Sequence, residues 1–306
     1  MKEGLCVWIE RAYLLWPLLA AGLYAIAALG LKSAAGKGFD TPVMTVLTNW
    51  AAAVAFLVFV PWGEAACWPW VWWVPVVMGT AFFFGQVFTV LALTRGDVSL
   101  ATPLLGTKVM LVAFLSAVIF KMGISVHVWE GAGAAVVGIA VLQLSGRKGP
   151  ARHALVTVVF SLLAALCFGL FDVLTQHWSK VDGYGGYGRV VPPALVWSGI
   201  LSAVLLPLSI GRWREMGSAA WGYLGLGVGL MTVQSLVLIT VIGKGGDAPR
   251  CNIVYGSRGV WSVVMVWMVG RWFGNRERHA GPGVMAGRLA GAGMILLGVV
   301  LVFLPE

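Results

Sequence analysis

The chain consists of apolar runs of about 20 residues, separated by charged or Gly/Pro-rich joints. A helix of about 20 apolar residues crosses the ~30 Å hydrocarbon core of a bilayer, and it satisfies all of its own backbone hydrogen bonds there. Only 11% of the residues are charged and 59% are hydrophobic, whereas a soluble domain has about 25% charged residues. The sequence therefore predicts an all-α polytopic membrane protein.

The apolar runs predict ten transmembrane helices, five in each half of the chain. The expected spans are 14–31, 42–62, 70–93, 98–120, 126–144, 154–176, 191–210, 221–242, 251–269 and 284–304. A basic joint with Arg147 and Lys148 separates the fifth span from the sixth. We therefore expect a five-helix repeat in residues 1–149 and a second in residues 150–306, together forming one integral membrane unit.

Part of the first half recurs in the second half. After 150 residues, Gly96, Asp97, Gly106, Thr107 and Lys108 are matched by Gly246, Asp247, Gly256, Ser257 and Arg258. After 160 residues, Gly131, Gly133 and Gly138 are matched by Gly291, Gly293 and Gly298. Because five spans is an odd number, the second repeat must cross the membrane in the opposite direction. Two inverted repeats with a substrate site near the midplane are the architecture of many secondary transporters.

Lys108 is expected deep within the fourth span. If that helix begins near Val98, Lys108 is about ten residues further on, which at 1.5 Å per residue is ~15 Å into the membrane. A cation at this depth costs roughly 2.5–3.5 kcal/mol, so intramembrane cations usually have a function. Arg258 occupies the matching position in the ninth span. We interpret the two residues as a paired basic site.

Three interpretations of the two cations remain open. They bind an anionic substrate, they form structural ion pairs or carbonyl contacts within the protein, or they extend to an off-centre membrane interface. Asp172 is the carboxylate expected deep within a span, and it would face Lys108 or Arg258. Other polar side chains expected within the membrane, as substrate ligands or as hydrogen bonds between helices, are Thr107, Ser257, Tyr255, Gln86, Gln234 and Asn49. Asp97 and Asp247 are expected to cap helix starts.

The chain resembles the drug/metabolite transporter superfamily, specifically its ten-helix EamA-type branch. The resemblance rests on the segment 92–103, the fourth span after it, the glycine-rich segment 129–138 and the counterpart segment 246–298. It implies a carrier of ten helices in two inverted repeats, which moves small metabolites and often exports them.

Two departures from the family pattern concern basic residues. Members commonly have proline where Lys108 and Arg258 stand, and glutamate where Lys121 and Arg271 stand. In this respect the chain is more similar to the branch that moves phosphorylated sugars and related anions, in which basic residues of these two helices grip the anion.

We therefore expect a secondary transporter that moves a small anionic metabolite by alternating access between the two repeats. An exporter of neutral or zwitterionic solutes such as amino acids is the alternative, and a non-transporting membrane scaffold is a third possibility. The sequence contains no Walker loop, GxSxG motif or metal-ligand cluster, so we expect neither enzymatic activity nor a cofactor.

The expected partners are a small-molecule solute and the lipid bilayer. The net charge of +9 arises mostly from residues between the spans, where membrane orientation and anionic lipid headgroups account for it without nucleic acid. The expected location is the plasma membrane, which in bacteria is the inner membrane.

Overall fold

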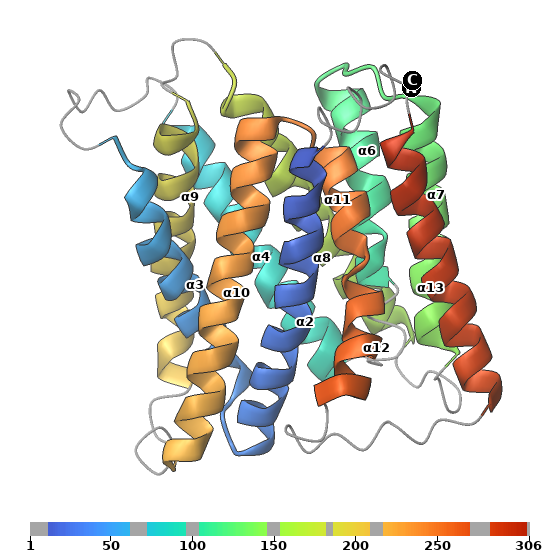
Figure 1. Cartoon of the computed structure of the whole chain (residues 1–306). Coiled ribbons are helices and arrows are strands. Elements are labelled where there is room, and N and C mark those ends of the chain that lie inside the picture. The colour runs from blue at the N-terminus through green and yellow to red at the C-terminus, as the bar shows by residue number, and fades with distance from the viewer. Residues whose placement is uncertain are drawn as a thin grey trace.

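The protein is a bundle of helices that stand side by side (Figure 1). The computed structural model describes residues 12–61, 72–95, 104–145, 154–181, 186–208, 217–269 and 282–304. Within these residues, seven helices are long and apolar enough to cross a membrane. Two shorter apolar helices cover Leu104–Ile119 and Val126–Leu142. The expected all-helical integral membrane protein is therefore confirmed.

The helices follow the order of the expected spans. They are α2 (Leu15–Gly36), α3 (Thr41–Phe56), α4 (Trp73–Arg95), α6 (Lys108–Ile119), α7 (Val126–Leu144), α8 (Ala154–Trp178), α9 (Tyr187–Ser202), α10 (Ser218–Gly245), α11 (Ala248–Gly256), α12 (Arg258–Val269) and α13 (Pro282–Phe303). Short 3-10 helices cover Ala12–Leu14 (η1), Leu57–Phe59 (η2) and Ala203–Leu208 (η3). Counting α11 and α12 as one interrupted helix, the described residues contain ten helices in the expected positions. The start of α2 and the end of α13 lie at the same end of the bundle (Figure 1).

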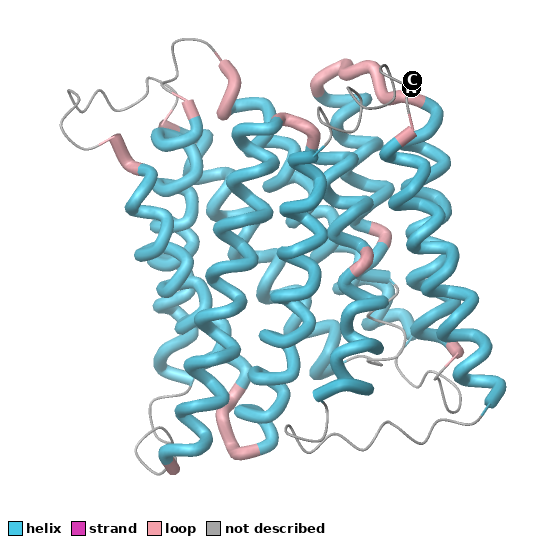
Figure 2. The backbone as a smooth tube through the Cα atoms, in the orientation of Figure 1, coloured by secondary structure: helices cyan, strands magenta, loops and turns pink. Residues whose placement is uncertain are grey.

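The fourth and ninth spans are interrupted, so the expectation of continuous helices over 98–120 and 251–269 is wrong. Thr107 forms a turn immediately before α6, and Ser257 forms a turn between α11 and α12. At both turns the N–H group bonds three residues back: Thr107 N to Leu104 O and Ser257 N to Val254 O, each 3.1 Å. Such bonds tighten a helix locally into a 3-10 turn. Figure 2 shows pink turn segments at mid-height in the bundle.

Side-chain hydrogen bonding helps to explain the first interruption. The Thr107 hydroxyl donates to the Leu104 carbonyl oxygen at 2.6 Å, the same oxygen that accepts from the Thr107 N–H. Threonine side chains that bond to nearby carbonyls compete with the regular helical ladder. Periodicity and hydropathy do not register this competition, so they predicted an unbroken helix.

Helices α7 and α13 pack closely through glycines. A Cβ on Gly138 would lie 2.7 Å from the Gly291 carbonyl oxygen, and one on Gly131 would lie 2.9 Å from the Gly298 carbonyl oxygen. The pairing of low with high residue numbers shows that the two helices run antiparallel. Small residues allow this approach of two backbones, which is a main source of helix association in membranes.

Four further helix pairs complete the bundle. α2 packs along α10, α4 along both α8 and α9, and α3 along α9. The tryptophan indoles add hydrogen bonds between these helices: Trp50 Nε1 donates to Gly199 O and Trp197 Nε1 donates to Thr80 Oγ1, each at 3.0 Å. Helix α6 contacts α7 and α8, α11 contacts α2, α6 and α7, and α12 contacts α2.

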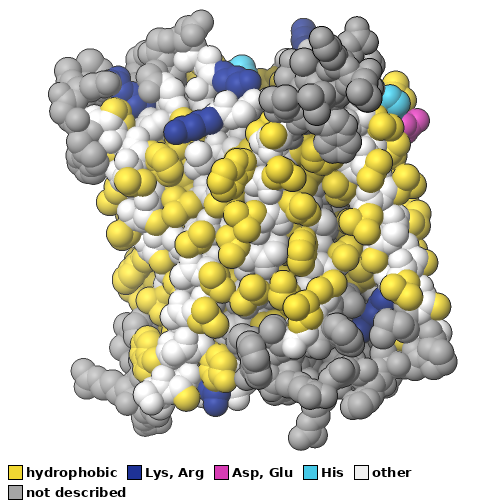
Figure 3. Space-filling view, viewed as in Figure 1, with side chains coloured by type: hydrophobic (Ala, Val, Ile, Leu, Met, Phe, Trp, Pro, Cys, Tyr) yellow, Lys and Arg dark blue, Asp and Glu magenta, His cyan; other side chains and the backbone are white. Residues whose placement is uncertain are grey.

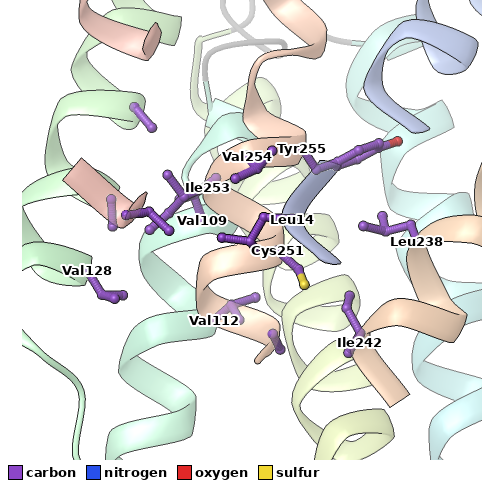
Figure 4. Packing of buried hydrophobic residues seen from close by; sticks show 14 of the residues in the cluster. Leu14, Val109, Val112, Val128, Leu238, Ile242, Cys251, Ile253, Val254 and Tyr255 are labelled. Carbon is purple, nitrogen blue, oxygen red and sulfur yellow. The ribbon is translucent and has the colours of Figure 1, made fainter. Parts of the chain in front are cut away.

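The largest apolar cluster surrounds α11. Eight of the nine residues of α11 are buried, which is the expected state of a helix enclosed on all sides. Figure 4 shows Val109 and Val112 of α6 beside Ile253 and Val254 of α11. This packing fixes α11 between other helices and thereby positions the residues at its two ends.

The outer surface is apolar over much of its height. In Figure 3, hydrophobic side chains cover the middle of the visible face, whereas Lys and Arg lie toward its upper and lower ends. Large apolar side chains are exposed on several helices, including Val54 (69%), Leu155 (78%) and Leu289 (67%). This distribution suits contact with lipid along the helices and with water or headgroups at their ends.

We expect the substitution Gly291→Ala to destabilise the protein, because the new Cβ would lie 2.5 Å from Leu142 N and 2.6 Å from Gly138 O. Overpacking of this kind typically costs about 1–3 kcal/mol. Gly293→Ala is the matched control, because nothing lies within 4 Å of its added Cβ. Thermal unfolding in detergent should show a lower melting temperature for Gly291→Ala alone. Equal melting temperatures of the two variants would contradict the packing.

Candidate binding site at the interrupted helices

A buried ion pair joins α6 to α8. Lys108 Nζ lies 2.6 Å from Asp172 Oδ2, and the two side chains are only 13% and 5% exposed. Asn252 Nδ2 donates to the same carboxylate oxygen at 2.8 Å and to the Ala248 carbonyl oxygen at 3.0 Å. Asp172 therefore connects α6, α8 and α11. The sequence analysis expected it to face Lys108 or Arg258, and its ion pair is with Lys108.

Arg258 lies between two tyrosine rings. Its guanidinium carbon is 5.0 Å from the centroid of Tyr24 and 4.8 Å from that of Tyr255. The two rings meet edge to face at 6.1 Å. The Tyr255 hydroxyl donates to Gln234 Oε1 at 3.0 Å, and Gln234 Nε2 donates to Ser235 Oγ at 2.8 Å. Side chains from α2, α10 and α11 thus hold the guanidinium by cation–π contacts and the hydrogen bonds behind them.

The ion pair and the arginine lie within electrostatic reach of each other. The positive charges of Lys108 and Arg258 lie close enough to repel each other, and Arg258 is also within electrostatic reach of Asp172. Two cations and one carboxylate leave a formal excess of one positive charge among these three side chains. A local excess of positive charge attracts anions. The arrangement is therefore suited to an additional negative group.

The helix interruptions add to the positive potential. Lys108 is the first residue of α6 and Arg258 is the first residue of α12. The first N–H groups of a helix have no partner four residues back, and they carry partial positive charge. The Ser257 hydroxyl beside Arg258 is 1% exposed and, among the described residues, has no hydrogen-bond partner. Helix N-termini with free donors favour anions.

The structure assembles most, but not all, of the expected site residues. Lys108, Asp172, Arg258, Tyr255 and Gln234 form one connected group. Thr107 and Ser257 adjoin the cations at the two turns; the Thr107 hydroxyl is bonded to its own helix.

Gln86 and Asn49 are not brought to this group by any contact among the described residues. Gln86 is half-buried in α4, and Asn49 is 2% exposed in α3. Both atoms of the Asn49 amide lack a hydrogen-bond partner in the described part of the chain. A role of either residue in substrate binding stays a prediction.

Asp247 caps α11, as expected. Its Oδ1 accepts from Arg250 N at 3.0 Å, and its Oδ2 accepts from Arg250 Nη1 at 2.8 Å and from the Tyr13 hydroxyl at 3.1 Å. The matching Asp97 and the expected basic residue Arg271 lie outside the described residues.

Two amide side chains were missed by the sequence analysis. Asn252 donates a hydrogen bond to Asp172. Gln176 Oε1 accepts at 2.7 Å from the N–H of Ala248, the first residue of α11. Both lie within or beside apolar spans, so their intramembrane position was the available signal. Their partners come from distant parts of the chain, which spacing does not reveal.

Comparison with known proteins identifies a family that the first half of the chain resembles. Residues 11–144 match the EamA-like transporter family. The resemblance to the EamA-type branch of the drug/metabolite transporter superfamily is thereby confirmed for this part of the chain. Lys108 lies within the matched residues. No curated protein matches the chain.

The fold is also known from solved structures. One with the description "Crystal structure of protein" has a TM-score of 0.76 to this chain at 18% sequence identity. The similarity covers 96% of this chain and 98% of the other. The likeness therefore extends over both halves of the chain, and at this identity it concerns the fold alone.

The Lys108–Asp172 pair makes a prediction for a double-mutant cycle. Removing one partner of a buried pair leaves an uncompensated charge, which typically costs about 3–5 kcal/mol. We expect Lys108→Met and Asp172→Leu each to lower the melting temperature strongly, and the double variant to regain much of the loss. Thermal unfolding of all four proteins in the same detergent measures the coupling. Additive losses would show that the two side chains do not interact.

Proposed function

We propose that this EamA-like protein is a secondary transporter of a small anionic metabolite, located in the plasma membrane, or in the inner membrane if the source is bacterial. One observation carries the proposal: Lys108 and Arg258 begin two interrupted helices, and both lie within electrostatic reach of Asp172, which is the buried carboxylate among the described residues. A bound anion compensates the excess charge that these residues create inside the membrane.

The two cations suit different parts of one anionic group. The Lys108 ammonium is a compact charge with three rotatable donors, whereas the Arg258 guanidinium presents a planar fork that matches carboxylate and phosphate oxygens. Tyr24 and Tyr255 hold the arginine from two sides, which lowers the entropic cost of orienting the fork. The Ser257 hydroxyl supplies a further donor.

The transport mechanism follows from two inverted repeats that rock around this site. Three relations support the repeats. The helix interruptions at Thr107 and Ser257 are 150 residues apart. Helices α2 and α8 are the first spans of the two halves, and α4 and α10 are the third spans. The contact of α2 with α10 and the contact of α8 with α4 therefore join equivalent spans. Gly131 and Gly138 of α7 correspond to Gly291 and Gly298 of α13 at an offset of 160 residues. The contact of Gly131 with Gly298 therefore corresponds to the contact of Gly138 with Gly291.

The antiparallel pairing of α7 and α13 favours inversion of one repeat relative to the other. Two equivalent helices that cross antiparallel are related by a twofold axis perpendicular to their length. In a bundle whose helices cross the membrane, that axis lies in the membrane plane, as in transporters with inverted-topology repeats. Alternating access then exposes the basic site first to one side of the membrane and then to the other.

A second candidate function is transport of a zwitterion such as an amino acid. The Lys108–Asp172 ion pair favours it, because the Asp172 carboxylate and the nearby Arg258 guanidinium offer partners for the two ends of a zwitterion. In this case the substrate ammonium binds Asp172 and the substrate carboxylate binds Arg258. Lys108 then remains an internal counter-ion.

Ligand-induced thermal stabilisation distinguishes the two candidates. We expect inorganic phosphate, glucose 6-phosphate or succinate to raise the melting temperature, and alanine and choline to leave it unchanged. A ligand at 100 times its Kd stabilises the folded state by about 2.7 kcal/mol. Lys108→Gln and Arg258→Gln should abolish the response, whereas Lys121→Gln, at an exposed position, should retain it.

Two results would contradict the anionic substrate. Stabilisation by alanine alone would favour the zwitterion, and an anion response that persists in both Lys108→Gln and Arg258→Gln would place anion binding elsewhere. Flux of the same solutes into proteoliposomes tests transport itself. Binding without flux would favour the membrane scaffold.

A further inference from the structure

An open apolar groove lies on the outside of the bundle, between α3 and α10. Its volume is about 540 Å³, and its nine lining residues are all Gly, Ala, Val, Leu or Trp. A volume of this size is within the range of ~300–1,000 Å³ that is usual for pockets holding small molecules. Lys108, Asp172 and Arg258 do not line it, so the groove is distinct from the basic site.

The groove is hollow because small residues lie between large ones. Ala51, Ala55 and Gly225 are among its lining residues, and a Cβ added to Gly225 would have nothing within 4 Å. Trp50 and Trp221 line the same groove, and they are 39% and 40% exposed. The groove therefore opens toward the surroundings of the protein, with indole rings beside a space that the neighbouring side chains leave unfilled.

The groove runs along the helices and not across them. Its residues on α3 extend from Leu47 to Ala55 and those on α10 from Trp221 to Val228, each set at the spacing of one helix face. Eight residue steps on α3 correspond to ~12 Å. One leaflet of a bilayer contributes ~15 Å of hydrocarbon, half of the ~30 Å core. The groove thus has nearly the length of one leaflet.

One end of the groove lies near a helix start and a basic side chain. Trp221 belongs to the first turn of α10, which begins at Ser218, and Phe39 packs on it edge to face at 5.0 Å. Lys37 is exposed, and its Nζ lies 5.5 Å from the ring centroid of Tyr223. In Figure 1, α3 and α10 both begin in the lower half of the bundle. Tryptophan and lysine at the ends of spans are typical of the lipid headgroup level.

We propose that this groove is a binding site for a phospholipid, with one acyl chain in the groove and the headgroup phosphate beside Lys37. An acyl chain gains free energy when its methylene groups are buried against apolar side chains. The phosphate accepts a charge-assisted hydrogen bond from the lysine ammonium. This proposal is independent of the transported solute, because it concerns the outer surface of the bundle.

Two other occupants fit the groove less well. A soluble small molecule is normally oriented by a few polar groups, and the described lining residues include no charged, hydroxyl or amide side chain. A symmetric dimer places the same patch of both copies face to face, so one hollow would meet another. Stable interfaces are packed as densely as protein interiors, which two facing hollows do not achieve. A flexible chain fills the groove without this difficulty.

Photo-crosslinking of the full-length protein in proteoliposomes tests the site. The vesicles contain phosphatidylcholine and phosphatidylglycerol, with a small fraction of phosphatidylglycerol that has a diazirine in one acyl chain, and mass spectrometry locates the label. We expect several times more label on residues 47–55 and 221–228 than around Leu155 or Leu289, which are 78% and 67% exposed. Equal labelling of all exposed faces would show ordinary lipid contact and overturn the proposal.

Filling the groove separates specific binding from general contact with lipid. We expect Gly225→Leu to lose most of the label in the groove with an unchanged melting temperature, because the new Cβ enters open space. Gly293→Leu is the matched control, because Gly293 is exposed on α13 and also has nothing within 4 Å of an added Cβ. It should keep the label. Lys37→Gln should also reduce the label, because the phosphate loses its cation.

Three results would contradict the proposal. Full labelling of the groove in Gly225→Leu would show that the chain does not lie there, and unchanged labelling in Lys37→Gln would overturn the position of the headgroup. A wild-type dimer in light scattering that Gly225→Leu converts to monomers, without enriched label, would assign the groove to a second copy. If Gly225→Leu does not fold, Ala51→Leu replaces it. Added phosphatidylglycerol should also raise the melting temperature of the wild type in detergent, and of Gly293→Leu, but not of the filled variant.

Discussion

The structure around the site is arranged to hold charge inside a helix bundle that faces lipid. A lone Lys108 would be costly at this depth, and Asp172 and Asn252 make it tolerable by joining α6, α8 and α11 at one point. The aromatic contacts of Arg258 bring in α2, and the hydrogen bond of Tyr255 to Gln234 brings in α10. Side chains from five helices therefore meet around the two cations.

The tightly packed helices and the interrupted helices have complementary roles. Glycine contacts hold α7 against α13 without space for a Cβ, which suits a rigid support. The turns at Thr107 and Ser257 instead place helix starts in the middle of the bundle, where the positive ends of the helix dipoles favour an anionic ligand. Irregular backbone at membrane depth is tolerated where it is buried in protein or lines a cavity. A carrier requires both properties, because rigid elements must move around a polar centre.

Sequence reasoning located the helices and the cations but not their surroundings. The span of α7 was predicted without error, and Lys108 is mostly buried among the helices; its depth in the membrane stays a prediction. The helix interruptions were not predicted, because they depend on local hydrogen bonds such as that of the Thr107 hydroxyl to Leu104 O. Such bonds leave the hydropathy pattern unchanged. Asn252 and Gln176 escaped because their importance lies in partners from other helices. Gln86 and Asn49 were expected by composition alone, and the described contacts do not bring them to the cations.

The sequence by itself determined that the chain crosses a membrane repeatedly, where most crossings lie, and that cations at positions 108 and 258 need compensation. These properties follow from hydrophobic length and from the cost of burying charge, both of which are local. Only the tertiary structure decided which carboxylate pairs with Lys108, which rings flank Arg258 and where the helices break. Those outcomes depend on contacts between segments far apart in the chain, and the apolar pattern is the same whichever helices become neighbours.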